Sequence, residues 1–128
     1  MKISQEQVAR FDQEGFLFFP DWFSSDEANL LLEEAALVYG LDRKEVVRET
    51  SGVARTAFAA HTYNEAFSRL GCHPRLIEPV VQILGEAVYM HQYKVNAKAA
   101  FDGEVWQWHQ DFRSEEHTSE LQSRTKLV

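Results

Sequence analysis

Trp108-His109-Gln110-Asp111-Phe112 is the stretch that decides how this chain is interpreted. It ends a segment, Val105 to Phe112, that we expect to form a β-strand. Side chains two positions apart on a strand share one face and lie about 7 Å apart. His109 and Asp111 are therefore expected to project together, between apolar neighbours. An imidazole and a carboxylate are two of the three ligands of the facial triad that holds Fe(II) in non-heme oxygenases, so the stretch predicts an iron site.

His-x-Asp spacing alone leaves two other interpretations open. In the first, the chain is a small non-catalytic binding module in which His109 and Asp111 are structural residues. In the second, it is a zinc-dependent, cupin-like hydrolase in which His61 or His91 supplies the third ligand. Cys72 stands beside a single histidine, lacks partners for a zinc site of its own and is interpreted as a buried thiol.

The residues before this stretch favour a second strand. Ala87 to Asn96 is rich in aromatic and β-branched residues, and Asp102-Gly103 is a turn signal. We expect the two strands to pair as an antiparallel hairpin. Because strand side chains alternate between faces, one face should carry four polar residues: Gln92, Lys94, Asn96 and Lys98.

Further towards the N-terminus the pattern is mostly helical. Capping boxes predict helices that begin at Ser4 and Ser24, and glycines predict their ends at Gly15 and Gly40. Two more helices are expected over residues 63–70 and from His73-Pro74 to Gly85. Phe16–Phe19 reads as a buried strand, and residues 41–55 as an irregular or mobile segment. The apolar positions expected to be buried in the second and last helices are Leu31, Leu32, Ala35, Ala36, Tyr39, Ile77, Val80, Val81 and Leu84.

Composition narrows the class of protein. A 45% hydrophobic chain with 12% aromatic residues can bury a globular core. The net charge of −7 argues against a nucleic-acid or anionic-membrane surface. Its single cysteine permits no internal disulfide. With no apolar leader and no apolar run long enough for a bilayer, we expect a cytoplasmic protein with neither nucleic acid nor membrane as partner.

The C-terminal end is expected to differ in origin from the rest, although a genuine polar C-terminus is the alternative interpretation. Residues 113–123, Arg-Ser-Glu-Glu-His-Thr-Ser-Glu-Leu-Gln-Ser, resemble the in-frame translation of a common sequencing-adapter oligonucleotide. We therefore predict two parts: residues 1–112 as the N-terminal part of an oxygenase domain, and residues 113–128 as a non-native tail that is disordered or adopts an incidental helix. His117 is accordingly not counted among the metal ligands.

Several motifs together resemble the phytanoyl-CoA dioxygenase family, which includes the ectoine hydroxylases. They cover residues 4–112, and each is modest alone but specific in combination. The motifs are Phe11-Asp12-Gln13-Glu14-Gly15-Phe16-Leu17, Phe23-Ser24-Ser25-Asp26, Tyr89 to Lys98, Phe101-Asp102-Gly103 and Trp106 to Phe112.

This resemblance implies an Fe(II)- and 2-oxoglutarate-dependent dioxygenase that uses O₂ to hydroxylate a small organic substrate. It implies that His109 and Asp111 bind the iron, that Lys98 contacts 2-oxoglutarate, and that Gln92 contacts the substrate. Arg55, Phe58 and His61 are candidates for the substrate entrance, although a structural role is the more common one for such residues.

The resemblance also implies an α+β fold, in which N-terminal helices flank the first strands of a double-stranded β-helix, or jelly roll. In the family a second iron-binding histidine and a 2-oxoglutarate-binding arginine follow further downstream. We therefore expect an incomplete jelly roll, a truncated chain that is inactive alone, and self-association through unpaired strand edges.

Overall fold

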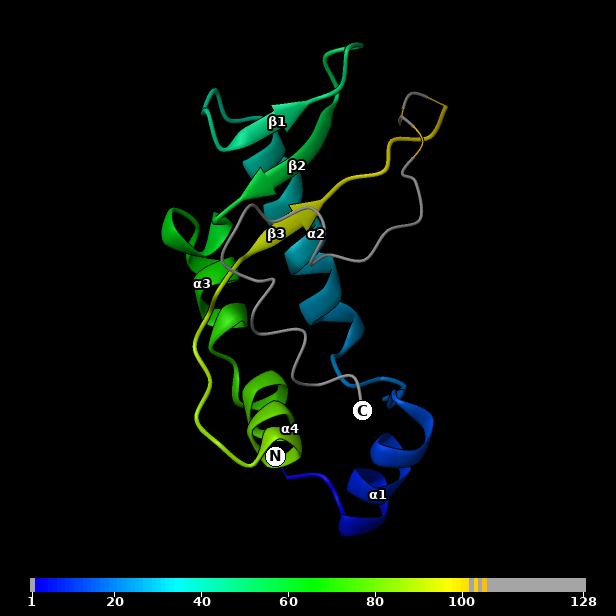
Figure 1. Cartoon of the computed structure of the whole chain (residues 1–128). Coiled ribbons are helices and arrows are strands. Elements are labelled where there is room, and N and C mark those ends of the chain that lie inside the picture. The colour runs from blue at the N-terminus through cyan, green and yellow to red at the C-terminus, as the bar shows by residue number, and fades with distance from the viewer. Residues whose placement is uncertain (1, 102, 104, 106–128) are drawn as a thin grey trace, which may run out of the picture.

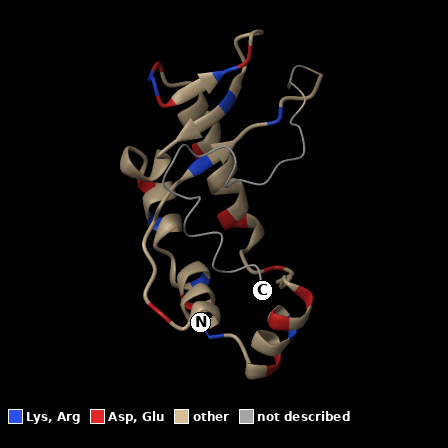
Figure 2. Cartoon of the chain, viewed as in Figure 1, with Lys and Arg blue, Asp and Glu red and all other residues tan. Residues whose placement is uncertain are grey.

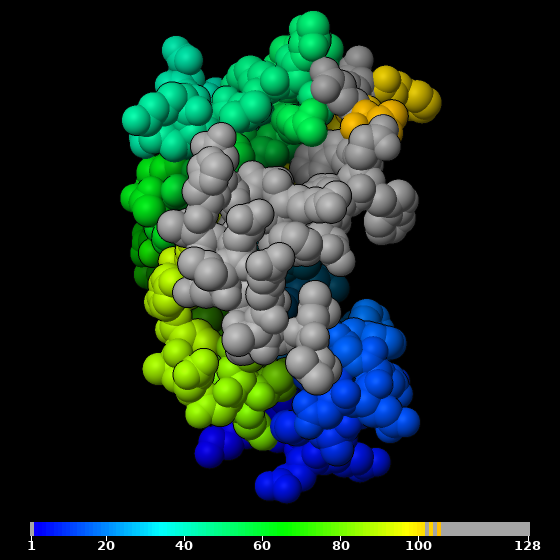
Figure 3. All heavy atoms as spheres, viewed as in Figure 1, coloured from blue at the N-terminus to red at the C-terminus, as the bar shows by residue number. Residues whose placement is uncertain are grey.

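The computed structural model of the chain describes residues 2–101, 103 and 105 (Figure 1). The hairpin of strands β1 and β2 lies at one end of the molecule, and helices α1 and α4 lie at the other (Figure 1, Figure 3). The predicted α+β class, with helices and strands in one chain, is confirmed, although individual strands differ. None of the described helices is long and apolar enough to cross a membrane. The elements in chain order are α1 (Gln5–Glu14), α2 (Ser25–Tyr39), β1 (Val46–Arg48), β2 (Ala54–Phe58), the 3-10 helix η1 (Ala60–Thr62), α3 (Glu65–Gly71), α4 (Pro74–Leu84) and β3 (Lys94–Asn96).

Helix ends follow the predicted capping signals. At the start of α1 the Ser4 hydroxyl accepts the backbone N–H of Gln7 at 3.1 Å, and the Gln7 side chain accepts the N–H of Ser4 at 2.8 Å. Ser24 and Glu27 form the same reciprocal pair at the start of α2. α1 ends at Gly15, whose φ of 80° is left-handed and unstrained only for glycine. The predicted ends of α2 and α4, at Gly40 and Gly85, are also confirmed.

The three strands form an antiparallel sheet in the order β1-β2-β3. A tight turn joins β1 to β2, in which the N–H of Glu49 donates to the carbonyl of Val53 at 2.8 Å. The prediction of an irregular segment over residues 41–55 is therefore wrong over β1 and the start of β2. Charged residues obscure the alternation there, and it is the burial of Val46 and Ala57 that fixes the strands.

The predicted strand at Phe16–Phe19 is absent, because the described sheet consists of other segments. Phe16 and Phe18 are 58% and 80% exposed, and Phe19 packs instead on the ring of Trp22, with centroids 4.5 Å apart. Among the described residues this segment has no partner strand, so its backbone groups gain no ladder hydrogen bonds from them.

Two further strand predictions concern β3 and the residues after it. The strand predicted over residues 87–96 is shorter in the structure and spans Lys94–Asn96, where it pairs with β2. The strand predicted over residues 105–112 lies, apart from Val105, outside the described residues.

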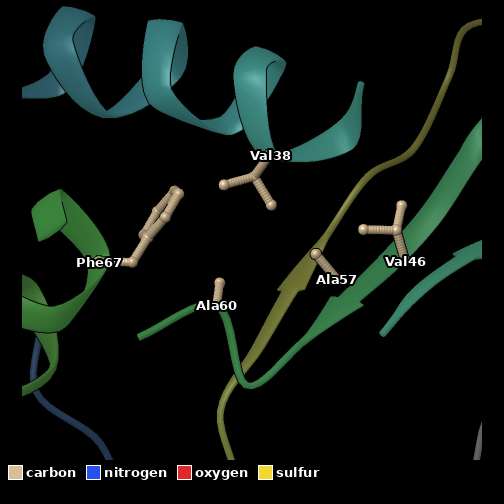
Figure 4. Close-up of a cluster of buried hydrophobic side chains, with 5 residues drawn as sticks. All are labelled: Val38, Val46, Ala57, Ala60 and Phe67. Atoms are coloured by element: carbon tan, nitrogen blue, oxygen red, sulfur yellow. The ribbon is translucent and has the colours of Figure 1, made fainter. Parts of the chain in front are cut away.

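α2 covers one face of the sheet and encloses the main core (Figure 1, Figure 4). The side chains of Val38, Val46, Ala57, Ala60 and Phe67 meet there, and each is at most 6% exposed. Leu31, Ala35 and Tyr39 pack against this cluster as predicted. Leu32 and Ala36 do not, since they are exposed, and so the predicted stripe was too wide.

α4 is less buried than its sequence suggests. Ile77 and Val81 are half-buried, but Val80 and Leu84 are 42% and 49% exposed, which contradicts their predicted burial. The buried residue of α4 is Pro79. One set of contacts of this helix is with α1 and the N-terminal residues, where Gln82 accepts the N–H of Ile3 at 3.0 Å and donates to its carbonyl at 2.6 Å.

Arg75, near the start of α4, binds the segment before α2. Its guanidinium forms an ion pair with Glu27, donates to the carbonyl of Trp22 at 2.7 Å and lies 4.2 Å from the ring centroid of Phe23. The Trp22 indole N–H donates in return to the carbonyl of Arg75 at 2.9 Å. These contacts join α4 to the start of α2 across a long stretch of sequence.

We expect the contribution of this ion pair to depend on pH. The Arg75 hydrogen bond, followed by the Ser24 backbone N–H, lowers the pKa of Glu27 from 4.5 to about 2. Because the pKa is lower in the folded chain, the stabilisation is complete above the unfolded pKa and is lost as the pH falls through the folded one. Glu27→Gln should therefore melt below wild type at neutral pH, and the difference should shrink between pH 4.5 and about 2.

Thermal unfolding followed by circular dichroism across this pH range measures the effect. Glu65→Gln is the matched control, because Glu65 pairs with Arg69 on a surface where both side chains are 78% exposed, and such pairs contribute little. A melting difference for Glu27→Gln that stays constant with pH would contradict the assignment.

Candidate functional site

The face of the sheet opposite α2 carries the predicted row of polar residues. Tyr93 and Val95 of the β3 region pack against the core on the α2 side. Their neighbours alternate with them, because residues 92–98 switch strictly between exposed and half-buried. Backbone pairing extends past the ends of β3, with Ala59 N–H donating to Tyr93 O at 2.8 Å and Ala97 N–H to Arg55 O at 2.9 Å. The expected face of Gln92, Lys94, Asn96 and Lys98 is thus present, and we call it the polar face.

Strand β2 contributes two side chains to the polar face. Thr56 is in register with Asn96, and its hydroxyl donates to the Asn96 side-chain oxygen at 3.0 Å. Phe58 is in register with Lys94, whose ammonium lies 5.8 Å from the ring centroid. Each of the three strands carries a basic residue (Figure 2). Lys94 of β3 belongs to the polar face, as does Lys98 two residues after the strand, and these bases suit the face to anionic ligands.

Lys98 lies at one end of the polar face and Gln92 at the other. The Lys98 ammonium donates to the carbonyl of Gly103 at 3.2 Å. Beside it lies an open cavity of about 480 Å³, lined by Asn96, Ala97, Lys98 and Val105. The two ends are six residue steps apart along an extended chain, which is roughly 20 Å. Side chains that far apart can contact two different ligands at once.

The three candidate residues for the substrate entrance, Arg55, Phe58 and His61, lie in different surroundings. Arg55 forms an ion pair with Glu49 at 3.2 Å, and the Glu49 side chain is only 3% exposed. His61 stacks on Tyr93, with ring centroids 4.8 Å apart, and its Nδ1 is buried with no hydrogen-bond partner among the described residues. These contacts of Arg55 and His61 are structural. Phe58 alone of the three belongs to the polar face.

The predicted iron ligands His109 and Asp111 lie outside the described residues. Among residues 2–101, 103 and 105, no three His, Cys, Asp or Glu side chains come together as a metal site. The alternative zinc site, with His61 or His91 as its third ligand, also requires His109 and Asp111. It therefore stays a prediction. The donors of the polar face, two ammonium groups and two amides, fit carboxylates rather than a metal cation. Cys72, predicted to be a buried thiol, is exposed, and its thiol contacts the carbonyl of Ser68 at 3.3 Å.

Thr56 is the residue of this face that sequence reasoning missed. It lies on β2, which was not predicted as a strand, and a single threonine does not form a recognisable sequence motif. The signal available was the alternation of Thr56 and Phe58 with the small apolar Ala57.

Comparison with known proteins completes the description. The profile of the phytanoyl-CoA dioxygenase (PhyH) family matches residues 11–123, including part of the predicted tail, whose origin stays a prediction. Ectoine dioxygenases are similar: that of Sphingopyxis alaskensis is 36% identical over 121 residues, and that of Halomonas elongata 34% over 117, in each case over 88% of this chain. L-proline trans-4-hydroxylase of Streptomyces griseoviridis is 36% identical over 80% of the chain.

Solved structures of EctD are also similar to this chain. EctD from S. alaskensis with bound Fe superposes with a TM-score of 0.78 at 34% identity, over 88% of this chain and 42% of that one. The same enzyme with 2-oxoglutarate and 5-hydroxyectoine superposes equally well, at 33% identity. The chain spans 35–39% of the length of the three curated relatives named above. With a family profile that matches most of its residues, the chain belongs to the phytanoyl-CoA dioxygenase family.

Proposed function

We propose that this chain is part of an Fe(II)- and 2-oxoglutarate-dependent dioxygenase that hydroxylates a small organic substrate with O₂. The observation that carries the proposal is the polar face, where lysines and amides alternate with the residues that bury β3 against the core. Relatives named ectoine dioxygenase and L-proline trans-4-hydroxylase support it, and so does the likeness to EctD with bound Fe.

Each end of the polar face has a role in this proposal. Lys98 binds a carboxylate of 2-oxoglutarate, because an ammonium forms strong, charge-assisted hydrogen bonds with carboxylates. Gln92 hydrogen-bonds the substrate at the other end. His109 and Asp111 hold the iron, which supplies the oxidising chemistry when it is bound. The helix α2 closes the opposite face of the sheet, so ligands reach the strands from one side only.

The wider architecture belongs to the same proposal. We infer that the described sheet forms part of a jelly roll, and that residues 113–128 contribute nothing to it. On its own the 128-residue chain then lacks a complete iron site and does not turn over. The exposed rings of Phe16 and Phe18 and the short open sheet favour self-association.

Binding of 2-oxoglutarate to the chain tests the role of Lys98. We expect Lys98→Met to weaken this binding by about tenfold or more, because a hydrogen bond to a charged group is lost. Lys94→Met is the matched control, since Lys94 lies on the same face four residues away. Titration of the ¹⁵N-labelled chain with 2-oxoglutarate, followed by amide chemical shifts, measures both variants.

Three outcomes would count against the proposed role of Lys98. The wild-type chain would show no shifts on the polar face at millimolar 2-oxoglutarate. Alternatively, Lys98→Met would bind as wild type does. Equal losses in Lys98→Met and Lys94→Met would indicate general charge attraction instead of a site.

A further inference from the structure

Thr56 has an unusual position for a hydroxyl-bearing residue of the polar face. It lies on the central strand, in register with Val47 of β1 and Asn96 of β3, and is only 6% exposed. A buried hydroxyl without a partner is costly, and that of Thr56 is satisfied by the Asn96 side-chain oxygen at 3.0 Å. The contact therefore fixes both side chains.

The direction of this hydrogen bond determines how the Asn96 amide is presented. An asparagine side-chain amide is planar, and its acceptor oxygen and its donor NH₂ group extend from the same carbon in different directions within that plane. Because the oxygen accepts from Thr56, the NH₂ group is directed away from Thr56. Asn96 also lines the cavity beside Lys98, and Lys98 lies two residues further along the same face, about 7 Å away.

We propose that Thr56 is a positioning residue that holds the Asn96 amide with its NH₂ group towards the cavity beside Lys98. The amide and the ammonium then act on the same carboxylate-bearing ligand. This inference rests on the proposed function, in which that ligand is 2-oxoglutarate. Thr56 is suited to the task because a β-branched side chain has few χ1 rotamers, so its hydroxyl direction is set by the strand itself.

The first test measures the side chain of Asn96 without any ligand. In wild type we expect NMR couplings to report a single χ1 rotamer and one set of side-chain NH₂ resonances. Thr56→Val, which keeps the shape but removes the hydroxyl, should give averaged rotamers, and Thr56→Ser should restore the fixed one. Thr62→Val is the control, because the Thr62 hydroxyl donates to the backbone carbonyl of Ala59 at 2.8 Å and not to Asn96.

The Asn96 rotamer of the wild-type chain tests the positioning role of Thr56 even where Thr56→Val does not fold. An averaged Asn96 rotamer in wild type would overturn the proposal. So would a fixed rotamer in a folded Thr56→Val chain.

The second test adds 2-oxoglutarate. Thr56→Val should weaken its binding about two- to tenfold, the range expected for one neutral hydrogen bond, and Thr56→Ser and Thr62→Val should bind as wild type does. Unchanged binding in Thr56→Val would overturn the positioning role. If 2-oxoglutarate moves neither the Lys98 nor the Asn96 resonances in wild type, the proposed function fails, and the ligand-free rotamers still decide the role of Thr56.

Discussion

Phe67→Ala is expected to lower the free energy of unfolding by about 3–5 kcal/mol, the usual cost of truncating a buried phenylalanine. Phe67 is 4% exposed and extends from α3 toward Val38 on α2 (Figure 4). Its ring also meets Tyr93 edge-on, with centroids 6.3 Å apart. Removing the ring opens a cavity between α2, α3 and the strand that carries the polar face. A loss of this size is a large part of the 5–15 kcal/mol that typically stabilises a domain.

Urea unfolding followed by circular dichroism measures the loss. Phe67→Leu should cost less than about 1.5 kcal/mol, because it retains most of the volume. Phe18→Ala is the matched control: Phe18 is 80% exposed, and its truncation should stay within about 0.5 kcal/mol. If Phe18→Ala proved as costly as Phe67→Ala, residues 16–19 would be buried after all, as their sequence suggests.

Local signals were enough to locate the helices. Ser4 and Ser24 satisfy the first N–H groups of α1 and α2 through side chains only three residues away, and Gly15 and Gly85 adopt left-handed φ angles that other residues avoid. These interactions involve neighbours in sequence. They therefore appear in the sequence as short, recognisable patterns.

Burial depends on distant partners and was harder to predict. Val38 is the largest fully buried side chain among the described residues, at 1% exposed, yet it was not in the predicted stripe of α2. It follows Leu31 and Ala35 at helical spacing, whereas Leu32 lies about 100° further round the helix and is 68% exposed. Only the position of the sheet decides which of these two neighbouring stripes is covered.

The same distinction applies to the strands and to the site. The alternation from Gln92 to Lys98 is visible in the sequence because small or apolar residues separate the polar ones. β1 and β2 were missed because their pairing depends on contacts made across the sheet, including the bulge between Val47 and Arg48. The polar face could therefore be predicted on β3, whereas the Thr56 contribution from β2 could not.

The strongest effect on ligand binding is expected for Asp111→Ala and His109→Ala. Each removes a proposed iron ligand, which should weaken Fe(II) binding by at least the 10- to 100-fold that loss of an outer partner typically costs. Anaerobic equilibrium dialysis of the chain against Fe(II) measures this. We also expect the wild-type chain to form no succinate from 2-oxoglutarate and to show no visible charge-transfer band with both ligands, because two protein ligands leave the triad incomplete.

Two further histidine variants separate this proposal from its alternatives. His117→Ala lies in the predicted tail and should bind Fe(II) as wild type does. His61→Ala should do the same, because the His61 ring stacks on Tyr93, which packs on the α2 side of the sheet. A site that survives Asp111→Ala but is lost in His61→Ala would rest mainly on histidines, as in a zinc-dependent hydrolase. Wild-type affinity in both Asp111→Ala and His109→Ala would leave these two residues with structural roles only, because two of the three donors that a facial triad requires would then hold no metal.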